Sequence, residues 1–167
     1  KTLVLDWRRH AGLDVLSALA STGAVPPAEV LADVAVMRRS VAADAARLCA
    51  QRADEQQIAA VVAAAHAYPD SLDLAAVAAA DLEFWTAGSE GAGNLAYRLA
   101  LNTLVAAITE VGAETIAGLN AAEVTDRPAH VDLAAAIAAR DAEGAGRQAA
   151  ELLTRFVDAC APRTEKE

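Results

Sequence analysis

The stretch DLEFWTAGSEGAGNLAYR, residues 81–98, organises the chain. It predicts the end of one helix near Trp85, a glycine-rich corner over residues 88–94, and the start of a second helix. Positions four apart share a helix face, so Asp81 and Trp85 lie on the same side of the first helix. The second helix carries polar residues at the same spacing: Asn94, Arg98 and Asn102. Two neighbouring helices are therefore predicted to present polar side chains to a shared interior.

Composition favours a single all-α domain. The chain has 167 residues, which is enough for one domain with a real core. Alanine supplies 46 of them, and the β-branched and aromatic residues do not alternate as they do in strands. The net charge of −9 argues against direct binding of nucleic acid. The sequence shows neither a signal peptide nor an apolar run long enough to span a membrane, so we expect no membrane contact and a cytoplasmic location.

Helix start and stop signals divide the rest of the chain. Helices are predicted over residues 13–23, 26–53, 54–68, 70–85, 94–111, 128–144 and 145–160. In this scheme Asp70 or Ser71 caps the fourth helix, residues 112–120 form a broken helix or loop, and residues 121–127 form a linker. The expected organisation is a lead-in over residues 1–12, a helical domain over 13–160 and a solvated tail over 161–167.

Few residues are candidates for chemistry. The sequence has no nucleophile elbow, phosphate-binding glycine loop or zinc-protease motif, and we expect no catalytic residues. Arg38 and Arg39 interrupt an apolar helix face, so one of them is predicted to point inward. A buried guanidinium needs an anion, either Asp81 or a ligand. His130, taken alone, is more typical of a core or helix-start histidine than of a ligand-binding one.

Several short segments, taken in order, resemble a known family. They are Met37-Arg38, residues 48–53 (LCAQRA), residues 81–84 (DLEF), Asn94, His130, Ala136-Ile137, Asp141 and Ala145. Their order is similar to that in the C-terminal effector-binding domain of the FadR branch of the GntR transcription regulators. This resemblance implies an antiparallel bundle of six or seven helices that encloses an effector pocket. It also implies a homodimer and contact with operator DNA through an N-terminal winged-helix domain that is missing here.

The resemblance also assigns the site. Many relatives hold a metal with one Asp and three His, and the matching positions here are Asp81, Trp85, His130 and Leu152. Trp and Leu cannot coordinate a metal, so we expect neither a metal nor another cofactor. With the inward polar positions Arg38, Arg98 and Asn102 added, the predicted effector-binding residues are Arg38, Asp81, Trp85, Arg98, Asn102, His130 and Leu152.

The apolar replacements favour a hydrophobic effector, such as a fatty acid or fatty acyl-CoA, whose chain gains about 0.8 kcal/mol for each buried CH₂. Three alternatives remain open at this point. The chain could be a metal-dependent sensor of small organic acids, a small helical enzyme that uses Asp81 and His130, or an interaction module without a pocket.

Overall fold

The computed structural model describes residues 6–70, 73–110 and 113–161. Within these ranges the chain is all-α, as predicted, and contains no strand. The helices are α1 (Trp7–His10), α2 (Leu16–Thr22), α3 (Pro27–Arg52), α4 (Glu55–His66), α5 (Leu74–Gly91), α6 (Leu95–Glu110), α7 (Ala113–Val124), α8 (Arg127–Ala138) and α9 (Ala142–Cys160). A 3₁₀ turn, Leu13–Val15, precedes α2. No helix in the described ranges is both long and apolar enough to cross a bilayer.

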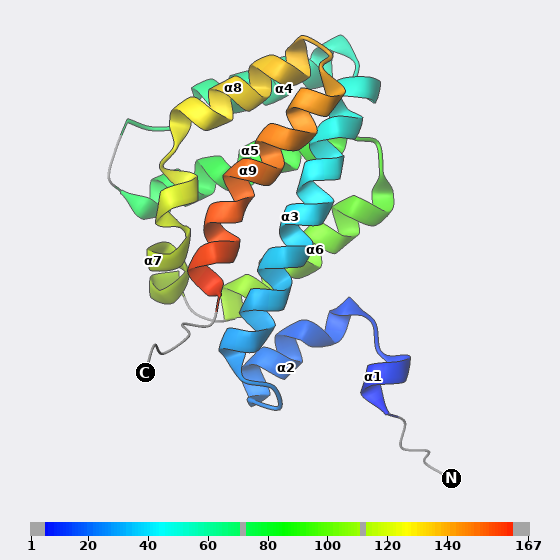
Figure 1. Cartoon of the computed structure of the whole chain (residues 1–167), viewed down its shortest axis with the longest axis vertical. Coiled ribbons are helices and arrows are strands. Elements are labelled where there is room, and N and C mark those ends of the chain that lie inside the picture. The colour runs from blue at the N-terminus through cyan, green and yellow to red at the C-terminus, as the bar shows by residue number, and fades with distance from the viewer. Residues whose placement is uncertain (1–5, 71–72, 111–112, 162–167) are drawn as a thin grey trace.

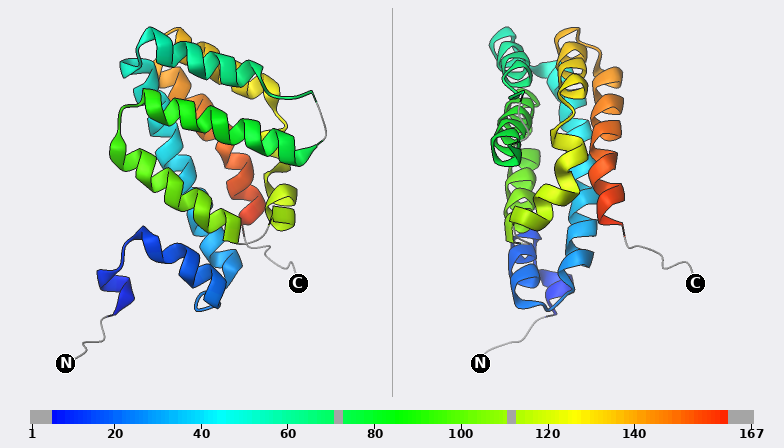
Figure 2. Two further views of the ribbon diagram at one scale, coloured as in Figure 1. Left: turned by 180° about the vertical axis from the view of Figure 1, so that it is seen from behind. Right: turned by 90° about the vertical axis from the view of Figure 1, so that its left-hand side faces the viewer.

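Helix α3 is the central element of the bundle. Pro27 stands in its first turn, where the missing N–H costs nothing, and the helix continues for 26 residues. It lies antiparallel to α9, and the two form the most extensive helix pair in the fold (Figure 1). Viewed edge-on, α4, α5 and α6 form one layer, and α8 and α9 lie on the opposite side of the molecule (Figure 2). The main core fills the space between these helices.

Helix α5 differs from the prediction at both ends. Its cap is Asp73 rather than Asp70, and the Asp73 carboxylate accepts hydrogen bonds from the backbone amides of Ala75 and Ala76; Ser71 lies outside the described residues. The glycine-rich segment continues the helix to Gly91 rather than forming a corner, and the turn is confined to the three residues before α6.

Gly91 allows close packing of α5 on α3. A Cβ on Gly91 would lie 2.5 Å from Cys49 Sγ and 3.2 Å from Ala53 Cβ. Only Gly93, at φ +61°, needs a left-handed backbone in this segment.

The second half of the chain also holds more helix than predicted. Most of the expected loop and linker over residues 112–127 is α7, which packs against α5 and α9; Gly112 lies outside the described residues. Helix α8 ends at Ala138 instead of Gly144, and Arg140 adopts φ +61° in the turn. Gly144 belongs to the first turn of α9, where the Asp141 carboxylate accepts a hydrogen bond from its N–H at 2.9 Å. Tertiary packing and a capping carboxylate therefore outweigh the glycine signals.

The two α5 glycines should respond in opposite ways to alanine. Gly88→Ala adds a methyl group with no atom within 4 Å, so it should stabilise the helix by about 0.5–1 kcal/mol. Gly91→Ala forces a contact with Cys49 and should destabilise the fold by about 1–3 kcal/mol. Urea unfolding of the two variants measures both shifts. Equal effects would contradict the close approach of α5 to α3.

Candidate functional site

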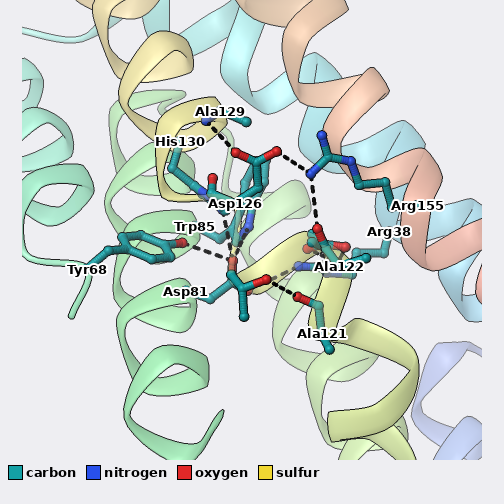
Figure 3. A network of polar contacts seen from close by, with 12 residues as sticks. Arg38, Tyr68, Asp81, Trp85, Ala121, Ala122, Asp126, Ala129, His130 and Arg155 are labelled. Atoms are coloured by element: carbon teal, nitrogen blue, oxygen red, sulfur yellow. Dashed lines mark hydrogen bonds and ion pairs between the residues drawn. The ribbon is translucent and has the colours of Figure 1, made fainter. Parts of the chain in front are cut away.

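A buried carboxylate, Asp81, is the centre of the polar network in the core. It lies on α5 and is only 6% exposed. Its Oδ1 accepts hydrogen bonds from the Tyr68 hydroxyl at 3.0 Å and from Trp85 Nε1 at 3.1 Å, and it lies 3.1 Å from His130 Nε2. Figure 3 shows these three side chains converging on Asp81 from α5, from the α4–α5 connection and from α8. The predicted Asp81–Trp85 face therefore exists, and its two members contact each other directly.

His130 and Asp81 share a proton. The His130 side chain is completely buried, and its Nδ1 lies 2.8 Å from the Asp126 carbonyl oxygen. A carbonyl only accepts, so Nδ1 must carry a hydrogen. The contact between Nε2 and Asp81 then requires one further proton, either on the imidazole or on the carboxyl group. The pair as a whole is electrically neutral in either form.

Arg38 carries the second half of the network. It is the inward-pointing arginine of α3, as predicted for one of the two, whereas Arg39 is partly exposed and reaches only Thr154 at 3.4 Å. Arg38 Nη1 donates to Glu123 Oε2 at 2.9 Å, and Nη2 lies 3.4 Å from Asp81 Oδ2. The guanidinium carbon is 5.8 Å from the ring centroids of both Trp85 and Phe156. Arg38 is thus held by two acids and two aromatic faces.

Glu123, on α7, is completely buried beside this arginine. Arg38 Nη1 forms an ion pair with its Oε1 at 2.7 Å and donates its hydrogen bond to Oε2. Burial raises the pKa of the Glu123 carboxyl to about 7, although the charge of Arg38 opposes the rise. Burial alone would lower the pKa of Arg38, and the attraction of Glu123 and Asp81 outweighs it and raises the pKa. Arg38 therefore stays charged, while Glu123 can change its charge near neutral pH.

A cavity of about 240 Å³ opens beside this network. Arg38 and Asp81 form its polar end, and helices α3, α5, α6, α7 and α9 all contribute lining residues. Much of the remaining wall is apolar: Ala42, Leu82, Trp85, Leu101, Val105 and Phe156. Its uncharged polar side chains are Thr86, Ser89, Asn102 and Asn120. Most of the wall can thus hold hydrocarbon, with the polar contacts concentrated in a few groups.

The cavity gathers five of the seven predicted effector residues, namely Arg38, Asp81, Trp85, Arg98 and Asn102. His130 stands behind Asp81 and is not in the lining. Leu152 lies elsewhere, in the core and at the floor of an open depression of about 570 Å³ between α8 and α9. A role in effector binding stays a prediction for all seven.

Sequence reasoning missed three participants, Tyr68, Asn120 and Glu123. Tyr68 stands before Pro69, where the pattern indicated only a helix end. The other two fall in the segment predicted as loop and linker, where polar residues are expected to face solvent. The need of the inward arginine for an anion was the available signal, and it pointed to Asp81 or a ligand rather than to Glu123.

The two alternatives of a metal site and of an enzyme both depend on Asp81 and His130. In the ranges that the structure describes, no three His, Cys, Asp or Glu side chains are grouped so that they could hold a metal ion. Arg38 instead supplies the positive charge beside Asp81. An enzyme that uses the pair would need substrate at His130, whose side chain has no exposed surface.

Loss of Arg38 should destabilise the fold strongly. Arg38→Met leaves Asp81 and Glu123 as buried acids without their shared cation, which costs about 3–5 kcal/mol. Arg39→Met, its matched neighbour, should cost less than about 1 kcal/mol. Chemical unfolding of both variants tests the difference. Similar values would mean that Arg38 is not the structural cation of the core.

The stability of the wild type should fall with pH relative to Glu123→Gln. The unfolded carboxyl titrates at about 4.3 and the folded one at about 7, so between these values only the folded state holds the proton. The contribution of Glu123 to the free energy of unfolding is complete below about pH 4 and is lost as the pH rises through about 7. The loss is on the order of 1–3 kcal/mol. Urea unfolding at about pH 5 and pH 8 measures the change. Exposed Glu83→Gln should behave like the wild type, and a parallel pH dependence in all three proteins would contradict the assignment.

The sequence matches the model of a known domain family. The FCD domain matches residues 33–155, which is more than half of the chain and includes all seven predicted site residues. Comparisons with curated proteins and with solved structures find no match. This match is consistent with a regulatory, effector-binding domain of the GntR type. Because the matched residues make up more than half of the chain, the chain belongs to the FCD domain family.

Proposed function

We propose that this chain is the ligand-sensing domain of a GntR-type, FadR-like transcription regulator, and that its effector binds in the cavity beside Arg38 and Asp81. The observation that carries the proposal is the cavity itself. It lies inside an FCD-family bundle, has a largely apolar wall, and ends on a fixed polar network. In this proposal helices α3–α9 are taken as the effector-binding bundle.

The cavity volume favours a compact hydrophobic effector. At about 240 Å³ it is smaller than the roughly 300–1,000 Å³ of pockets that hold drug-sized ligands, which suits a short chain or a single ring. The effector classes that the resemblance implies are a hydrophobic or fatty acid and a fatty acyl-CoA. A short acid fits this volume, whereas the nucleotide part of an acyl-CoA would have to lie outside it.

Effector binding would act on DNA through a shift in helix arrangement. The lining comes from five helices, so a ligand contacts elements that are far apart in the sequence. It can change operator binding only by as much as it prefers one arrangement over another. The operator itself would be bound by the N-terminal winged-helix domain that the resemblance implies, in the cytoplasm.

A homodimer is part of the proposal. Leu95 and Leu99 follow one another at helical spacing on α6 and are 72% and 57% exposed. This apolar strip is suited to burial against a second copy, which would place two sensors in one regulator. Native mass spectrometry of the purified chain reads the subunit number, and a monomer at micromolar concentration would contradict the dimer.

Blocking the cavity mouth should abolish the effector response. Ala78 is exposed on α5 and lines the cavity, so Ala78→Phe should fold normally and exclude ligands. The probe is a panel of small hydrophobic acids, amides and alcohols, scored by thermal unfolding. A ligand at about 100 times its Kd stabilises by about 2.7 kcal/mol, or about 5–10 °C for a domain of this size.

Ala79→Phe is the matched control, because Ala79 is the next exposed residue of the same helix and is not in the lining. Its response should equal that of the wild type. If no compound stabilises the wild type, or if Ala78→Phe keeps the full response, the cavity is not the effector site.

A further inference from the structure

The cation at the polar end of the cavity already has an anionic partner. Glu123 contacts Arg38 Nη1 through both oxygens, at 2.7 and 2.9 Å, and Asp81 faces Nη2 at 3.4 Å. These are the positions at which a ligand carboxylate would bind an arginine. Glu123 is completely buried behind Arg38 and does not line the cavity, so it occupies the guanidinium from the protein side.

The charges of the network balance without a ligand. Asp81 and His130 form one neutral pair through their shared proton, and Arg38 with ionised Glu123 forms a second. An anionic ligand at Arg38 would add an unmatched negative charge beside two buried acids. Arg38 and Asp81 are nearly buried, so solvent screens such a charge only weakly and its repulsion by the two acids is costly.

The remaining polar groups of the cavity suit an uncharged ligand. Arg98, the other lining cation, pairs with Glu90 at 3.3 Å. The Asn120 side-chain oxygen is buried in the lining and has no hydrogen-bond partner. It needs a donor, which an amide or hydroxyl group supplies and a carboxylate does not.

We propose that Glu123 sets the charge selectivity of the cavity. It acts as an internal carboxylate on Arg38, so the cavity binds an uncharged, hydrogen-bond-donating molecule more tightly than an anion of the same shape. The inference rests on the proposed function, because it takes the cavity as the effector site. Among compact effectors, amides and alcohols should therefore bind more tightly than free acids.

The test compares hexanamide with hexanoate, which share their shape and differ mainly in charge. Binding to the wild type is measured by isothermal titration calorimetry at about pH 8, where the raised pKa still leaves most of Glu123 ionised. Hexanamide should bind at least about tenfold more tightly, a difference of about 1.4 kcal/mol. Equal or tighter binding of hexanoate overturns the inference. If that hexanoate binding is lost in Ala78→Phe, the cavity nevertheless remains the binding site.

Glu123→Gln tests whether Glu123 itself, rather than the cavity as a whole, causes the preference for uncharged ligands. The change removes one charge, keeps the shape, and leaves Asp81 as a partner for Arg38. Hexanoate affinity should rise at least about tenfold, and hexanamide affinity should change less than about threefold. The control Glu83→Gln removes the same charge from the exposed face of α5 and should leave both affinities as in the wild type.

The outcomes distinguish the two proposals. If Glu123→Gln leaves the ratio of the two affinities unchanged, Glu123 does not set the selectivity, whereas the cavity remains the binding site. If neither ligand binds the wild type at millimolar concentration and the wider panel also fails, the proposed function falls and the inference falls with it. If Glu123→Gln does not fold, the wild type is measured again at about pH 6, where Glu123 is mostly protonated and hexanoate is still mostly ionised. The preference for hexanamide should then shrink, and an unchanged ratio of the two affinities overturns the role of Glu123.

Discussion

The guanidinium of Arg38, buried between Glu123 and Asp81, is the interaction on which the rest of the structure depends. A charge in the core is tolerated only when its partners are close and hydrogen-bonded. The partners here come from different helices, since Arg38 belongs to α3, Asp81 to α5 and Glu123 to α7. His130 of α8 joins the same carboxylate. One ion network therefore fixes the relative positions of four helices, which small alanine side chains alone would specify poorly.

This network also shapes the cavity beside it. Trp85 donates to Asp81 and faces Arg38, so its indole is held as one wall of the cavity, and Phe156 of α9 faces the same guanidinium. The polar end is rigid because nearly every group in it has a partner, and the wall opposite is mostly hydrocarbon. Affinity for a ligand must then come mainly from burial of apolar surface, and specificity from the few uncharged polar groups that remain.

In the proposed sensor, stability and ligand binding would depend on the same residues. A ligand that disturbed Arg38 or Glu123 would act on the contacts that hold α3 and α7 together, which is a direct physical route from binding to helix movement. Glu123 is well placed for such coupling, because it is buried, has one oxygen without a hydrogen bond, and titrates near neutral pH. The proposed sensor is thus a bundle whose central ion pair lies next to its ligand.

The sequence by itself determined the all-α class, the long helix over residues 27–52, the shared face of Asp81 and Trp85, and an inward arginine in need of an anion. These follow from helical periodicity and from the cost of burying a charge, which are local or general rules. Only the tertiary structure decided that the anions are Asp81 and Glu123, 43 and 85 positions away along the chain. It also decided that glycines 88 and 91 lie inside a helix, where Gly91 lets α5 pack closely on α3. Leu152 was separated from the cavity for the same kind of reason, because the packing of α9 turns it toward α8.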